Sequence, residues 1–156
     1  MFDSIAGIPL HPLVVHAVVI LLPLACVGAG AVAIVPRWDR QFGFLVVSCS
    51  VVATGAAIVA KQSGEALASR VGFPTEHQNV AQWIPWFAGL LLICVAALWW
   101  LDRTRRDARS TSVKVVAAIT IVAALVALGW VIVAGHTGAT AVWGTTIETT
   151  SPDTFK

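Results

Sequence analysis

The chain has 156 residues, about the length of one domain, and a formal net charge of +2. Hydrophobic residues make up 58% of it and charged residues only 12%, whereas soluble domains carry about 25% charged residues. The surface of such a fold cannot be covered by water alone, so we expect a membrane protein. The small charge, with arginines between apolar runs rather than along one helical face, argues against nucleic acid as a partner.

Four apolar runs are long enough to cross a membrane as helices. A helix rises about 1.5 Å per residue, so a hydrocarbon core of about 30 Å takes roughly 20 apolar residues. The first run begins at Pro12, which suits a first helical turn, and ends before Pro36. The second ends at the polar segment 61–65, and the third has Pro85 near its start, where proline is tolerated or bends the helix. The predicted spans are residues 12–35, 42–60, 80–101 and 113–136.

Lys and Arg are distributed unevenly over the connecting segments, which predicts an orientation because short basic loops stay in the cytoplasm. The two loops on one side contain Arg37, Arg40, Arg103, Arg105, Arg106, Arg109 and Lys114. The opposite side contains only Lys61, Arg70 and Lys156. We therefore expect a multi-pass protein of the inner or plasma membrane with both termini outside the cytoplasm.

Short connections between the spans predict an all-α, integral membrane, up-and-down four-helix bundle over residues 1–144. Alanines at helical spacing suit close helix packing in lipid, and they are Ala25, Ala29, Ala33, Ala53, Ala57, Ala60, Ala117, Ala124 and Ala127. Residues 145–156 are polar and rich in Thr, and we expect them to form an external C-terminal extension.

All four histidines fall on the same predicted side of the membrane. His11 precedes the first span and His16 lies a little over one turn further on, while His77 precedes the third span and His136 ends the fourth. Imidazole near lipid is costly unless it has a partner, and ionisable groups there are functional candidates. Because neutral imidazole binds transition metals and ligates haem iron, this layer predicts a cofactor site.

A b-type haem needs two imidazoles that face each other from different helices, with small residues where the macrocycle approaches backbone. His16 and His136 are the predicted ligands, with His77 as the substitute for His16. Gly135 and Gly138 flank His136 and leave such room. Three further polar groups are predicted partners of the haem propionates, and they are Arg70, Lys61 and His11.

Two alternatives stay open at this point. Three or four of the histidines, with His16, His77 and His136 foremost, could hold copper or zinc without a porphyrin. A histidine at a helix end can also bond to exposed carbonyl groups or to lipid headgroups, as in a structural subunit without any cofactor.

Independent catalytic activity is not expected, because the chain has no Tyr, no nucleophile elbow, no phosphate-binding loop and no HExxH zinc motif. A transporter is also disfavoured. Transporters usually have discontinuous spans with polar groups near the membrane midplane, and these spans are nearly free of such residues between their ends.

The opening segment 7–16, GIPLHPLVVH, and the closing segment 135–139, GHTGA, resemble a bacterial family of four-span membrane proteins known as a domain of unknown function, family 2231. Ala139 stands where many members have Gly. The resemblance covers nearly the whole chain and implies a fold similar to small di-haem cytochrome b bundles, with haem b as the cofactor. By analogy, it implies an electron-transport protein or an accessory subunit whose partners are the bilayer and other membrane subunits of a respiratory complex.

Overall fold

Long helices account for most of the molecule. The structure, a computed structural model, describes residues 4–5, 8–72, 75–103 and 108–149. A short antiparallel ribbon of β1 (Ser4–Ile5) and β2 (Ile8–Pro9) precedes the first helix. The helices are α1 (Leu10–Ile34), α2 (Pro36–Val71), α3 (Thr75–Ala81), α4 (Ile84–Asp102) and α5 (Thr111–Thr149). Arg105, Arg106 and the end of the polar extension lie outside the described residues.

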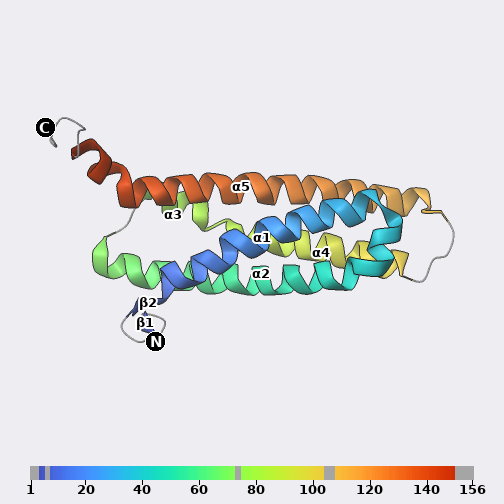
Figure 1. Ribbon diagram of the computed structural model, residues 1–156, viewed down its shortest axis with the longest axis horizontal. Helices are drawn as coiled ribbons and strands as arrows, with labels where there is room; N and C mark the ends of the chain where they lie inside the picture. The colour runs from blue at the N-terminus through green and yellow to red at the C-terminus, as the bar shows by residue number, and fades with distance from the viewer. Residues whose placement is uncertain (1–3, 6–7, 73–74, 104–107, 150–156) are drawn as a thin grey trace, which may run out of the picture.

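The long helices α1, α2, α4 and α5 run side by side along the long axis of the molecule (Figure 1). Each of them packs on two neighbours, in the cyclic order α1, α2, α4, α5, and α3 packs against α5. The described chain has four segments long and apolar enough to cross a membrane, with α3 and α4 together forming the third. The prediction of an all-α four-helix bundle is confirmed.

The helices are longer than the predicted spans, and α2 differs most. It begins at Pro36, with only Val35 between it and α1, so the first basic loop forms its opening turns. It then continues past residue 60 through the polar segment, where Lys61 and Glu65 form an ion pair of 2.5 Å one turn apart. It ends at Gly72, whose positive φ of 98° suits glycine.

The third span bends between α3 and α4, at Pro85 in the first turn of α4. Proline has no N–H to donate to the preceding turn, so a continuous helix cannot form here. The carbonyl of Val80, just before the bend, accepts hydrogen bonds from the backbone N–H of Trp83 at 3.3 Å and from the indole N–H of Trp130 on α5 at 2.8 Å. The hydrogen bond from the indole thus holds the bend against α5.

Small side chains form the helix interfaces. All the alanines that the sequence places at helical spacing are buried, with Ala29 and Ala53 fully inaccessible. Leucines such as Leu22, Leu91 and Leu98 are buried beside them, whereas many other large apolar side chains point outward, including Leu45 at 66% and Leu125 at 63% exposure. This arrangement suits lipid, in which helices associate through close packing of small residues rather than by removing apolar surface from water.

The buried side chain of Arg109 links several helices at the end of the bundle where α1 meets α2. Its Nε donates to Asp102 Oδ2 on α4 at 2.5 Å, and its two terminal nitrogens donate to the carbonyls of Ala33 and Val32 on α1. Asp39 on α2 lies 3.6 Å from the guanidinium, and all three charged side chains are buried. The carbonyls belong to the last turn of α1, where no backbone donor of the same helix is available. The sequence places Arg109 only in a basic loop.

Replacing Arg109 by Met should destabilise the protein strongly, because Asp102 and Asp39 then remain buried without the guanidinium between them. Removing one partner of a buried ion pair costs about 3–5 kcal/mol. We expect the free energy of unfolding to fall by that amount, measured by denaturant titration in mild detergent with circular dichroism. Arg37→Met, at an exposed position near the same end, is the control and should change stability little. Equal losses in the two variants would contradict the structural role of Arg109.

Candidate functional site

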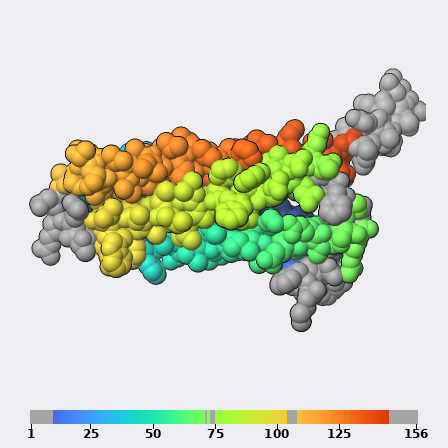
Figure 2. Space-filling model, turned by 180° about the vertical axis from the view of Figure 1, so that it is seen from behind, coloured from blue at the N-terminus to red at the C-terminus, as the bar shows by residue number. Residues whose placement is uncertain are grey.

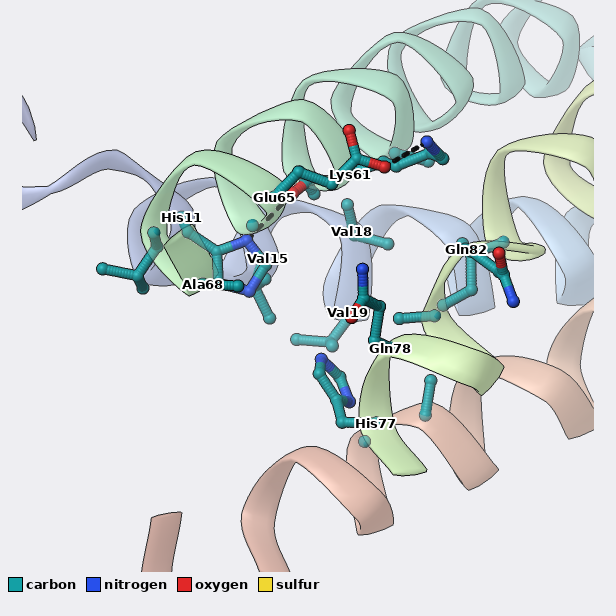
Figure 3. Close-up of a pocket in the computed structure, with 18 of the residues that line it drawn as sticks. His11, Val15, Val18, Val19, Lys61, Glu65, Ala68, His77, Gln78 and Gln82 are labelled. Atoms are coloured by element: carbon teal, nitrogen blue, oxygen red, sulfur yellow. Dashed lines mark hydrogen bonds and ion pairs between the residues drawn. The ribbon is translucent and has the colours of Figure 1, made fainter. Parts of the chain in front are cut away.

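A cavity of about 170 Å³ lies between α1, α2, α3 and α5 at the end of the bundle opposite Arg109. Its walls are mainly apolar, with small residues such as Ala57, Ala134 and Gly135 among them. Figure 2 shows the opening between α2 and α3 from behind, with α1 visible inside it. The polar side chains that line it are His11, Lys61, Glu65, His77, Gln78 and Gln82. His11 and His77 lie on different sides of this space (Figure 3).

His11, in the first turn of α1, is held by α2. Its Nδ1 lies 2.9 Å from the carbonyl oxygen of Ala60. A carbonyl only accepts, so Nδ1 carries the proton and donates, and in the neutral ring Nε2 keeps its lone pair. The ring lies against Gly64, where an added Cβ would be 2.8 Å from Cε1 of His11. The extension of α2 beyond residue 60 therefore supplies both the acceptor and the space for this imidazole.

His77, on α3, is held by α5 in a similar way. Its Nδ1 lies 3.3 Å from Oγ1 of Thr137, and this hydroxyl donates to the carbonyl of Ala134 at 3.1 Å. The hydroxyl oxygen is then the acceptor and Nδ1 the donor, which again leaves Nε2 of the neutral ring available. The ring lies against Gly138, where an added Cβ would be 3.1 Å from Cε1.

The two imidazoles thus have matching surroundings although they come from different helices. Each is held through Nδ1, each packs on a glycine, and both line the same apolar cavity. Histidines that bind metals almost always donate their other ring N–H to a backbone carbonyl, a carboxylate or water, which fixes the ring and raises its basicity. The arrangement at His11 and His77 follows this rule and can supply two nitrogen ligands.

The structure does not bring His16 and His136 to this cavity. His16 is exposed and its Nδ1 lies 2.5 Å from the carbonyl of Pro12 in its own helix, and His136 is exposed on α5. Five residues of helix turn a side chain by about 140°, so His11 and His16 cannot share a face. The layer of histidines is present, but only His11 and His77 point into the bundle.

The other predicted cofactor residues divide between the cavity and the surface. Gly135 lines the cavity, and Gly138 is the glycine beneath His77. Lys61 lines it as well, but is paired with Glu65. Arg70 is exposed near the end of α2 and is not among the lining residues.

Gln78 and Gln82 also line the cavity, and they are not among the site residues predicted from the sequence. Gln78 and Gln82 are four residues apart, about one helical turn, which would have placed them on one face of a helix. Among the side chains that the structure describes, no three His, Cys, Asp or Glu residues are grouped so as to hold a metal ion. His16, His77 and His136 therefore do not form a common site there.

The family model described as Predicted membrane protein (DUF2231) matches residues 7–151. The chain belongs to this family. The match and the four apolar helices together make this DUF2231 protein an integral membrane protein, and the resemblance found in the opening and closing segments is confirmed. No curated protein and no solved structure matches the chain.

Two glycines of α2 in this DUF2231 protein allow a test of the His11 environment. Replacing a helical Gly by Ala normally stabilises by roughly 0.5–1 kcal/mol. Gly55→Ala should do so, because nothing lies within 4 Å of its added Cβ. Gly64→Ala should instead lower the free energy of unfolding, because the methyl group would displace the His11 ring. Detergent unfolding monitored by circular dichroism measures both, and equal stabilisation would show that the ring does not pack on Gly64.

Proposed function

We propose that this chain binds haem b between His11 and His77 and serves in electron transport, either as a small b-type cytochrome or as an accessory subunit of a respiratory membrane complex. The proposal rests on the pair of imidazoles of His11 and His77. They come from two helices and line one apolar cavity, and each is held by a contact of its Nδ1. Bis-histidine ligation needs this donor pair and no further protein ligand.

The surroundings of the two histidines also fit a flat, mostly apolar cofactor. Small residues from α2 and α5 leave room for a ring beside the backbone, and they include Ala57, Ala60, Ala68 and Gly135. The side chain of Gln78 projects into the same space (Figure 3). The cavity of about 170 Å³ is smaller than the roughly 300–1,000 Å³ of ordinary ligand pockets. Binding therefore requires Gln78 to move aside and α3 to shift outward.

Each polar residue then has a defined task. His11 and His77 would hold the haem iron through Nε2, while Ala60 and Thr137 keep the two rings oriented through Nδ1. Lys61 lines the cavity and would exchange its ion pair with Glu65 for a charged hydrogen bond to a propionate. One-electron transfer is the chemistry that bound haem supplies. The mainly apolar walls would place a bound haem in surroundings of low polarity, which is one of the factors that set a haem reduction potential.

The number of donors favours haem over copper or zinc bound directly to side chains. A zinc site takes three or four protein ligands, whereas the cavity offers two imidazoles and Glu65, whose carboxylate is paired with Lys61. A structural subunit without any cofactor would explain the bundle, but it would not need two imidazoles to be held with Nε2 facing one cavity.

An absorption spectrum of the detergent-purified protein, produced with added haem, tests the proposal. We expect a Soret band and, after dithionite, the sharp bands of a low-spin ferrous b-type cytochrome. His11→Ala and His77→Ala should each abolish the low-spin spectrum, because each removes an axial ligand. His16→Ala and His136→Ala are matched controls on the same side of the bundle and should retain it.

Absence of a Soret band and of iron from the wild-type protein would overturn the haem proposal. Stoichiometric copper or zinc without porphyrin would favour the metal alternative. A low-spin spectrum that survives in both His11→Ala and His77→Ala, but is lost in His16→Ala or His136→Ala, would assign the ligands to the other pair.

We also propose that both chain termini and the histidine end face the outside of the cell. The support is the charge distribution, since Arg37, Arg40, Arg103 and Lys114 lie at the end of the bundle away from the histidines. A phosphatase that is active only outside the cytoplasm should work when fused after Gly72 or at the C-terminus, and should be inactive when fused after Ala108. The reverse pattern would overturn the orientation.

A further inference from the structure

A second hollow lies at the end of the bundle away from the histidines. Its volume is about 570 Å³. It is bounded by the last turn of α1, the beginning of α2, the segment just before α5 and the first three turns of α5. Figure 1 shows these helix ends meeting at the right of the molecule. This hollow shares no lining residue with the histidine cavity.

One half of this hollow is basic. Among the residues that the structure describes, three cationic residues line it, Arg40, Arg109 and Lys114, and no acidic side chain does. Arg109 donates hydrogen bonds to Asp102 and to two carbonyls of α1, and it forms the inner wall of the hollow. Arg40 on α2 and Lys114 on α5 also line the hollow and are both exposed, and the charge of Arg40 acts on the buried carboxylate of Asp39 as well.

The other half is apolar and reaches the outer surface of the bundle. Ile34 at the end of α1 is 69% exposed, and Ala118 and Ile121 continue the wall along α5. Lys114 and Ile121 are seven residues apart, so the charged mouth and the apolar floor are about 10 Å apart along the helix. A ligand that matches both halves has an anionic head and an apolar chain.

We propose that this hollow binds one anionic phospholipid, with its phosphate between Arg40 and Lys114 and an acyl chain along Ile34, Ala118 and Ile121. The charge complementarity selects an anionic headgroup, and the apolar floor selects a lipid over a free phosphate ion. Basic pockets between helices on the cytoplasmic side are a recurring means of binding anionic headgroups. The distribution of Lys and Arg predicts that this end faces the cytoplasm. The proposal does not depend on a cofactor in the histidine cavity.

Native mass spectrometry of the full chain in mild detergent can measure this binding directly. The probes are phosphatidylglycerol and phosphatidylcholine with identical acyl chains. We expect one phosphatidylglycerol to bind with clear preference. Each cation near a lipid phosphate is worth about fivefold in affinity. The double variant Arg40→Gln/Lys114→Gln should therefore bind phosphatidylglycerol roughly 30-fold more weakly and phosphatidylcholine as before.

The matched control removes two charges from the same end but outside the hollow. Arg37→Gln/Arg103→Gln should keep phosphatidylglycerol affinity within about threefold, because screened charges outside the site contribute little. Circular dichroism confirms that each variant is folded. An equal loss in the control pair would mean general surface attraction and would overturn the proposal, as would a wild-type protein with no preference between the two lipids.

A third variant tests the apolar half without altering any charge. Ala118→Phe places an aromatic ring over the floor and should weaken phosphatidylglycerol binding at least tenfold, even if the double charge variant fails to fold. Inorganic phosphate, added as a competitor at the same concentration as the lipid, should not displace it. Unchanged lipid binding in Ala118→Phe, or displacement by phosphate, would show a site for small anions only and would overturn the proposal of a lipid site.

Discussion

Arg109 ties three helices together where the chain makes its tightest reversal. With only Val35 between α1 and α2, the last carbonyls of α1 have neither a following turn nor a loop to satisfy them. The guanidinium supplies donors to two of these carbonyls and to Asp102 on α4, and it faces Asp39 on α2. Unpaired polar groups are costly at membrane depth, so this cluster determines how the helix ends can be placed relative to one another.

The arrangement of the helix ends around Arg109 also affects the opposite end of the bundle, because the helices are long and closely packed. Alanines at the interfaces allow the long helices to approach closely along their whole length, so a position fixed at one end sets which residues meet at the other. Because α2 is 36 residues long, it carries Ala60 and Gly64 to the first turn of α1. His11 then finds both its hydrogen-bond acceptor and its space there.

The two ends of the bundle differ chemically as a result. At one end, two imidazoles face an apolar cavity with their Nδ1 atoms engaged, and at the other, Arg40 and Lys114 stand at the mouth of a hollow with an apolar floor. The proposed haem at one end and the proposed anionic lipid at the other would give the bundle a fixed orientation and a defined lipid contact.

The sequence alone determined the membrane environment, the four helices, the family and the side of the bundle on which the histidines gather, because these follow from hydropathy, from loop length and from short motifs. It did not determine which histidines face each other. That choice depends on the rotation of α1 and on the extension of α2 through a polar segment that hydropathy assigns to a loop. The burial of Arg109 likewise follows from packing, because only the folded bundle brings Asp102, Asp39 and the end of α1 around one guanidinium.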